Sequence, residues 1–284
     1  MTFRNRRRKW VNNVMLSITG IFAFLTVSSL FLILAYLVYN GGKSIDLDFF
    51  TQLPKSTGEV GGGMANAIVG SAEIIAFAAI FGLPIGFFTG VYLAEWGSSG
   101  GFPFLVRYMA DLLNGVPSVV IGIFTWTVLV QPMHTASGLA GGIALSLMLI
   151  PIMAKNTEQF LREVPRSLRE GALALGAPKW QAIATVVVPA ARKGILTGAI
   201  LGVARIAGES APLLFTSLNN QFWSNPLKEP TASLPVMIYS HAIAPFDDWH
   251  RQAWAAGLVL LLLVLAANIA ARWIMSRGHV AVRG

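Results

Sequence analysis

The sequence predicts an all-α integral membrane protein, a bundle of six transmembrane helices with both termini in the cytoplasm. Hydrophobic residues make up 55% of its 284 residues and charged residues only 12%, whereas charged residues are about a quarter of an ordinary soluble domain. Six apolar segments approach or exceed the length that crosses a bilayer. The basic residues gather in segments that would share one side of the membrane.

The first predicted span covers residues 14–39 and follows a basic cytoplasmic segment, residues 1–13. A basic start before an apolar run is also typical of a signal peptide. Here the apolar run is too long, and it lacks a convincing cleavage site of small residues. We therefore expect a retained helix that begins in the cytoplasm.

The main transmembrane domain is predicted over residues 65–275, with a cytoplasmic tail at residues 276–284. Its spans are expected at residues 65–93, 108–130, 138–153, 195–217 and 254–274. The external segment between the last two contains the run 234–239, which is too short to cross a bilayer. This segment is either a surface for a binding protein or a plain connector.

Two of these spans carry helix-weakening residues. Gly82, Gly86 and Gly90 recur every four residues and predict a face for close packing between helices. The run Gly115-Val116-Pro117-Ser118 frees backbone groups that protein or a water-filled cavity must satisfy. It indicates either part of a permeation path or a kink that serves packing.

The distribution of positive charge predicts the orientation. Sixteen of the 21 Lys and Arg residues fall in segments predicted to be cytoplasmic, four in external segments, and Arg205 lies within a span. Such a bias marks the cytoplasmic side of membrane proteins. The net charge of +8 is therefore a topological signal and does not indicate a nucleic-acid partner. The absence of cysteine excludes disulfides and thiolate metal sites.

A long polar interruption, residues 154–194, separates two spans. Within it, residues 166–176 predict a helix of about three turns, because Pro165 suits a helix start and Gly176 a helix end. So short a helix is marginal alone in water, so it either docks on a protein surface or lies on the membrane. Its candidate contact residues are small or charged: Arg166, Arg169, Glu170, Gly171, Ala172 and Gly176.

Arg205 and Glu209 are predicted inside the fifth span, four residues apart, so that they could form an ion pair on one helix face. Gly194, Gly198 and Gly202 continue the same stripe, which predicts that the pair faces protein and not lipid. The pair is either a structural salt bridge or part of a path. In the second interpretation, Arg205 offers fixed donors to an oxyanion and Glu209 holds it in place when substrate is absent.

Three features of the polar loop resemble the EAA loop of ABC-importer permeases: Glu170-Gly171-Ala172, Gly176 and Val188-Pro189. In that family the loop inserts into a cleft on the ATPase subunit. Gly171 departs from the usual Ala and costs roughly 1 kcal/mol of helix propensity. Further matches narrow the resemblance to permease subunits of phosphate importers: residues 115–118, 156–158, 174–177 and 204–214. The similarity covers most of the span from Met64 to Thr216 and is weak outside it.

The resemblance implies a non-catalytic permease subunit of the type I (MetI-like) fold in the bacterial cytoplasmic (inner) membrane, without a cofactor of its own. It also implies the partners of an ATP-driven phosphate importer. These are a second permease subunit (PstC), two copies of an ATPase (PstB), a phosphate-binding protein (PstS), membrane lipid and inorganic phosphate. The chain has one such loop, whereas two ATPases need two, so a second permease is required; the sequence alone equally allows a homodimer.

Two other functions remain open from the sequence. A permease for another oxyanion, such as sulfate or molybdate, would share the same loop. An ion-coupled secondary transporter would work without an ATPase and would not need a docking helix. A phosphate-binding loop for ATP is excluded at Gly42-Lys43-Ser44, because Leu37 stands where that motif requires glycine. ATP must therefore be hydrolysed by another chain.

Overall fold

The computed structural model describes residues 3–56, 59–97 and 100–276, and its regular elements are helical apart from one isolated bridge between Pro54 and Gly62. In chain order they are α1 (Phe3–Gly42), α2 (Leu47–Thr51), α3 (Ala65–Glu95), α4 (Gly101–Gly115), α5 (Ser118–Thr125), η1 (Trp126–Val130), α6 (Gln131–Met133), α7 (Gly138–Glu163), α8 (Arg166–Ala174), α9 (Lys179–Ala182), η2 (Ile183–Val187), α10 (Val188–Ala207), α11 (Leu213–Thr216), α12 (Leu234–Ala242) and α13 (Asp247–Ser276). The two η elements are π-helical turns. The prediction of an all-α protein is confirmed.

Among the described residues, five helical stretches are long and apolar enough to cross a membrane: residues 7–42, 65–95, 138–163, 179–207 and 247–269. The third predicted span is not one straight helix. Residues 101–115 and 118–133 form a pair of helices bent by 105°, which together would make a sixth span. The bend lies at Val116 and Pro117, because proline has no N–H to donate and its ring disfavours a helical residue before it.

Two helices also end at residues other than the predicted limits of their spans. α7 continues to Glu163, beyond the predicted end at residue 153, because Thr157, Glu158 and Leu161 are buried against other helices and extend its packed face. α10 ends at Ala207, well before the predicted residue 217. Gly208 follows, and the chain then passes through Pro212, two residue types that weaken a helix.

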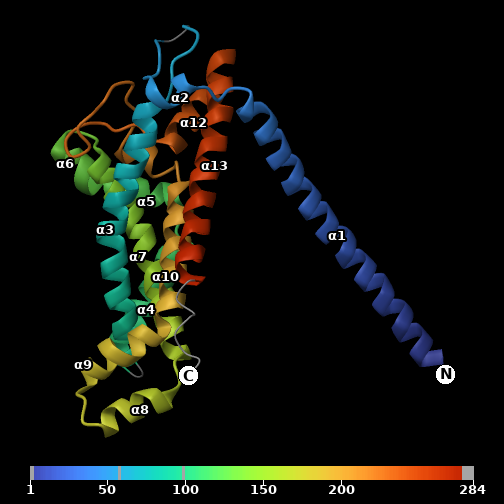
Figure 1. Cartoon of the computed structure of the whole chain (residues 1–284), viewed down its shortest axis with the longest axis vertical. Helices are drawn as coiled ribbons and strands as arrows, with labels where there is room; N and C mark the ends of the chain where they lie inside the picture. The colour runs from blue at the N-terminus through green and yellow to red at the C-terminus, as the bar shows by residue number, and fades with distance from the viewer. Residues whose placement is uncertain (1–2, 57–58, 98–99, 277–284) are drawn as a thin grey trace.

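The helices α3 and α7 lie side by side, with α7 in the interior of the bundle and α3 along one edge (Figure 1). Gly82, Gly86 and Gly90 are buried on α3, as the four-residue spacing predicts. A methyl group at Gly86 would lie 2.6 Å from Cβ of Met153 on α7. Small residues therefore bring the two helix backbones close, which is a main source of helix association where there is no hydrophobic driving force.

Replacing Gly90 with alanine should lower the stability of the bundle. An added Cβ would lie 2.5 Å from both the Ala154 carbonyl oxygen and Cβ of Thr157, and such overpacking typically costs about 1–3 kcal/mol. The thermal unfolding midpoint of the detergent-solubilised protein measures this, at about 2–4 °C per kcal/mol. The control is Gly20→Ala on α1, where no heavy atom lies within 4 Å. Equal midpoints for the two variants would refute the packing argument.

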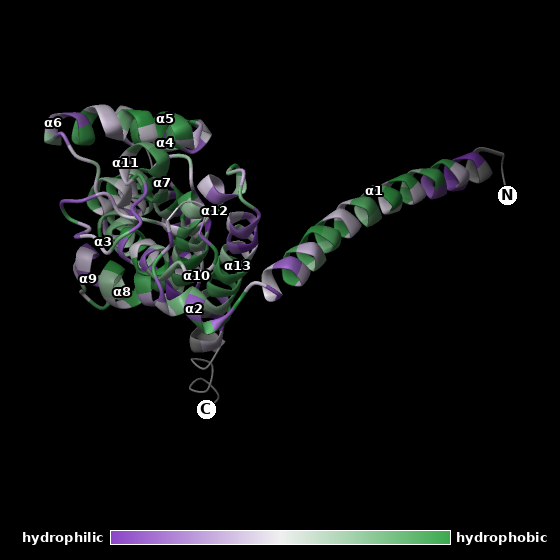
Figure 2. Cartoon of the chain, turned by 90° about the horizontal axis from the view of Figure 1, so that it is seen from above, coloured by the Kyte–Doolittle hydropathy of each residue, from purple (hydrophilic) through white to green (hydrophobic). Residues whose placement is uncertain are grey.

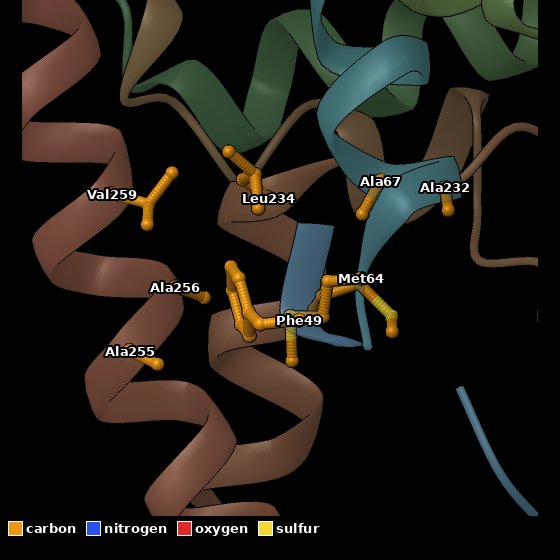
Figure 3. Close-up of a cluster of buried hydrophobic side chains, with 9 residues drawn as sticks. Phe49, Met64, Ala67, Ala232, Leu234, Ala255, Ala256 and Val259 are labelled. Carbon is orange, nitrogen blue, oxygen red and sulfur yellow. The ribbon is translucent and has the colours of Figure 1, made fainter. Parts of the chain in front are cut away.

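A buried apolar cluster closes the end of the bundle near α2 and α12. Figure 3 shows Phe49 from α2 beside Met64, with Leu234 from α12 and Ala256 and Val259 from α13 around them. Phe49 is only 1% exposed, and Asp46 caps its short helix by accepting a hydrogen bond from the Phe49 N–H. This cluster joins the segments around α2 and α12 to the long helices α3 and α13.

The long helix α1 extends away from the other helices, and only the C-terminal end of α1 meets α13 (Figures 1 and 2). There the Tyr36 ring packs edge-on against the Trp254 ring, with centroids 5.1 Å apart. The remaining length of α1 leaves its apolar side chains exposed. Its first residues lie at the level of α8 and α9 in Figure 1, at the opposite end from α2.

Candidate functional site

The predicted docking helix is present as α8, which projects from one end of the bundle together with α9 (Figure 1). Pro165 stands at the N-cap position, immediately before the first turn. The helix ends at Ala174, and Gly176, two residues later, has a φ of 85°, which suits a residue without a side chain. The Gly176 N–H donates to the Leu173 carbonyl at 2.9 Å, and the Ala177 N–H donates to the Ala172 carbonyl at 3.2 Å. These two bonds form a Schellman motif, which fixes the end of the helix.

None of the residues of α8 is buried in this chain. Arg166 and Glu170 are exposed, and Leu175 directly after the helix is 90% exposed. A Cβ added at Gly171 or Gly176 would meet no heavy atom within 4 Å. Most of the predicted contact residues are thus available to a partner, as a docking helix requires.

Arg169 differs from the other predicted contact residues because its guanidinium group is engaged within the chain. Its Nε and Nη2 donate to one carboxylate oxygen of Glu95 at 3.1 and 2.9 Å, and its Nη1 donates to the Val164 carbonyl at 2.6 Å. The Glu95 side chain is only 6% exposed. Arg169 therefore anchors α8 to the ends of α3 and α7, whereas we predicted an outward contact at the rim.

The bend between α4 and α5 borders a small polar cavity of about 110 Å³. The helices α4, α5, α7 and α10 contribute to its lining, which comprises Leu113, Asn114, Val116, Ser118, Met148, Ile152, Arg205 and Glu209. The structure therefore brings Arg205 and Glu209 together with the helix break at residues 115–118. This juxtaposition favours the permeation-path interpretation of that break over a kink that serves packing alone.

The predicted ion pair between Arg205 and Glu209 is absent from the ion pairs of the described residues. The reason is the early end of α10: Glu209 lies beyond the last helical residue, Ala207, so the four-residue helical spacing does not apply to it. Instead, the Glu209 N–H donates to the Ile206 carbonyl at 3.1 Å as the chain leaves the helix. Both side chains still line the same cavity.

The glycine stripe of α10 faces protein, as predicted. Side-chain atoms of Phe160 and Asn156 occupy the space where Gly194 and Gly198 would carry a Cβ, and Leu149 lies 2.9 Å from that position at Gly202. All three neighbours belong to α7. The stripe therefore packs α10 against α7 and leads to the cavity at Arg205.

A second, larger cavity of about 560 Å³ lies among α3, α10, α12 and α13. Its lining side chains are aliphatic apart from Ser71, and that hydroxyl oxygen already accepts the Leu234 N–H at 2.7 Å. An apolar lining cannot replace the hydration of an oxyanion. The smaller polar cavity is therefore the candidate substrate site, although it has a fifth of the volume.

The sequence interpretation did not anticipate a group of charged side chains at the end of the bundle that carries α8. Glu95 on α3 and Glu158 on α7 are largely buried carboxylates, and Arg107 on α4 donates its Nε to Glu158 at 2.8 Å. Arg162 also pairs with Glu158, at 2.6 Å. Glu158 lies in the matched run 156–158, but that run does not reveal its ion-pair partners, and no such run marks Glu95, Arg107 or Arg162. Among the described residues, no three His, Asp or Glu side chains gather as a metal site.

Comparisons with known proteins agree with this arrangement. Residues 82–278 match the family model described as binding-protein-dependent transport system inner membrane component. The phosphate transport system permease protein PstA of Yersinia pestis is 47% identical over 84% of this chain and 81% of its own length. The protein of the same name from Haemophilus influenzae is 43% identical over 93% of this chain and 94% of its own. The similarity thus extends well beyond the span from Met64 to Thr216 that we predicted.

Two solved structures share the fold. A chain of an inward-facing MetNI methionine ABC transporter superposes with a TM-score of 0.63 at 19% identity, over 75% of this chain and 96% of that one. A chain of a bacterial alginate ABC transporter superposes with a TM-score of 0.68 at 16% identity, over 97% of each chain. The chain therefore belongs to the family of binding-protein-dependent transport system inner membrane components and, within it, to the PstA permease proteins.

Proposed function

We propose that this chain is the transmembrane permease subunit of an ATP-driven importer of inorganic phosphate. The observation that carries this proposal is the joint presence of an arginine-lined polar cavity at a break between membrane helices and of an exposed docking helix at one end of the bundle. The names of the relatives supply the identity of the substrate. A permease for sulfate or molybdate would also have the docking helix. The relatives of this chain, however, are named as phosphate permeases.

The lining of the small cavity suits brief contact with an oxyanion. Arg205 supplies a guanidinium group that stays charged and donates in a planar fork that matches phosphate oxygens. Asn114 and Ser118 add neutral donors from either side of the helix break. Glu209 brings a negative charge to the same cavity, which limits how tightly an anion is held. A point of passage needs this balance, because tight binding would slow release.

The docking helix α8 would transmit the work of ATP hydrolysis. The chain carries no complete ATP-binding loop, so two ATPase subunits (PstB) would hydrolyse ATP, and the permease itself catalyses no covalent chemistry. Their closure would draw together α8 and its counterpart on a second permease subunit (PstC) and switch the path from inward-facing to outward-facing. A phosphate-binding protein (PstS) would deliver substrate at the opposite face, near α2 and α12.

In the proposed orientation, α8 and both chain termini lie in the cytoplasm. The supporting observations are the excess of basic residues in the segments joined to α8 and the position of the α1 start at the level of α8 (Figure 1). The protein lies in the inner membrane, as its family description states. The predicted cytoplasmic tail, residues 276–284, falls outside the described residues except for Ser276.

Vesicles that contain this chain with the three partner proteins should accumulate phosphate only when ATP is supplied on the α8 side. At a labelled-phosphate concentration that saturates transport, a tenfold molar excess of sulfate should leave uptake nearly unchanged, whereas the same excess of unlabelled phosphate should strongly reduce labelled uptake by isotope dilution. The measurement is uptake of radiolabelled phosphate with and without each competitor. Inhibition by sulfate as strong as by phosphate would favour the permease for another oxyanion. Uptake that follows an ion gradient without ATP would favour a secondary transporter.

A further inference from the structure

We propose that the ion pair between Arg169 and Glu95 is the connection through which a displacement of α8 moves the membrane helices. This inference rests on the proposed role of α8 as the ATPase docking helix. It makes Arg169 a positioning residue inside the permease, in addition to any surface that α8 presents to a partner. The ion pair would pass motion from α8 to α3. A chain of contacts then leads from α3 to the polar cavity.

The first link joins α8 to α3. Because α8 has no buried residue, its place on the bundle depends strongly on polar contacts. Arg169 supplies four of them: two to Glu95, one to the Val164 carbonyl and one to the Leu161 carbonyl. The Arg169 side chain is 21% exposed and the Glu95 side chain 6%. A planar guanidinium in so sheltered a place makes strong, directional bonds that transmit a push or a pull.

The second link joins α9 to the same point. The Lys179 ammonium group donates to the Glu95 main-chain carbonyl at 2.7 Å and lies 4.7 Å from the centre of the Trp96 ring. Glu95 is thus held through its side chain by α8 and through its main chain by α9. Both arms of the polar loop, before and after the turn at Gly176, meet at the last residue of α3. A tilt of the loop would therefore displace that residue.

The third link joins the end of α3 to the cavity. Arg107 on α4 donates its Nη2 to the Leu93 and Gly97 carbonyls at 2.9 and 2.8 Å. α4 then runs on to Asn114, which lines the cavity with Arg205. The helical rise over these seven residues is about 10 Å. A shift of the end of α3 would therefore carry α4 and change the cavity at the helix break, which gives the inferred route from α8 to Arg205.

Arg169→Gln should uncouple ATP hydrolysis from transport. In vesicles with all partner proteins, the ATPase should remain bound and hydrolysis should stay within about twofold of wild type, while phosphate moved per ATP should fall about tenfold, within the usual range of coupling between sites. The double variant Glu95→Gln/Arg169→Gln should fall equally. It leaves no buried carboxylate without a partner, so it keeps the test valid if the single variant fails to assemble. Hydrolysis and uptake are measured in the same vesicles.

The matched control is Glu163→Gln, a carboxylate-to-amide change at an exposed position of the last turn of α7. It should leave the ratio unchanged. Because the chain has no native cysteine, Glu95→Cys/Arg169→Cys permits a covalent replacement of the ion pair within this subunit. The ratio should be low in this variant and should return to within about twofold of wild type after treatment with a short thiol cross-linker. A residue that merely supports folding would not be rescued in this way.

An unchanged ratio in both glutamine variants would overturn the inference and leave the proposed function standing. A proportional loss of uptake and hydrolysis that the cross-linker does not restore would do the same. Loss of assembly in both glutamine variants would also overturn it, because the pair would then serve folding. Wild-type vesicles without ATP-dependent phosphate uptake would overturn the proposed function and this inference with it. A restored ratio after cross-linking, with the control unchanged, would support it.

Discussion

Arg205→Gln should lower phosphate uptake by at least about tenfold while the complex still assembles. Arg205 is the arginine of the polar cavity at the break between α4 and α5, and it lies at the end of the glycine stripe that packs α10 on α7. The glutamine side chain can still donate hydrogen bonds, but it lacks the positive charge and the planar set of donors of the guanidinium group. A charged hydrogen bond contributes about 1.5–3 kcal/mol, and tenfold in rate corresponds to about 1.4 kcal/mol. We therefore expect uptake to fall by at least about tenfold, and about 100-fold if two such bonds are lost.

The measurement is the initial rate of ATP-dependent uptake in vesicles, with recovery of all subunits by purification as the test of assembly. Arg192→Gln is the matched control, because it makes the same change on α10 at an exposed position near its start. Arg205→Lys should retain partial uptake, since it keeps the charge without the planar fork. Normal uptake by Arg205→Gln would show that the residue only supports the structure.

Glu170→Lys should prevent the ATPase from binding and so remove ATP-driven uptake. Glu170 is exposed on α8, directly after Arg169, whose side chain is held against Glu95. Reversing a charge inside a docked interface costs about 2–5 kcal/mol, so the affinity for the ATPase should fall by at least about 30-fold. Because the anchor of α8 is unchanged, the isolated permease should fold as before.

The two readouts are co-purification of the ATPase and uptake in vesicles. Glu163→Lys serves as control, because it reverses an exposed carboxylate on the last turn of α7, outside α8. Uptake that continues in Glu170→Lys with the ATPase still bound would remove Glu170 from the interface. Uptake that continues after the ATPase is lost would contradict the importer mechanism as a whole.

Several elements were predictable because their causes are local in sequence. The apolar lengths predicted most of the spans, the glycine spacing on α3 predicted its packed face, and Gly176 predicted the end of α8. In each case the signal and the structure lie within a few residues of one another, so hydropathy and helix-end chemistry suffice.

The predictions that failed depended on contacts between distant residues or on where a helix ends. The rule of four-residue spacing placed Arg205 and Glu209 on one helix face, but α10 ends between them. α7 continues past residue 153 because polar residues in its last turns are buried against other helices. Local composition does not contain this information, because the free energy that decides it comes from packing.

The sequence by itself determined the fold class and the family, and it predicted the helix that we propose as the docking helix and the two charged residues that we propose for the path. Hydropathy, charge bias and short motifs carry these features along the chain. Only the tertiary structure decided which way each charged side chain faces. Arg169 and Glu95 are separated by 74 positions in the chain, and their pairing depends on how α8 is folded back against α3. Such a contact arises from the placement of whole helices, for which neither residue carries a local signal.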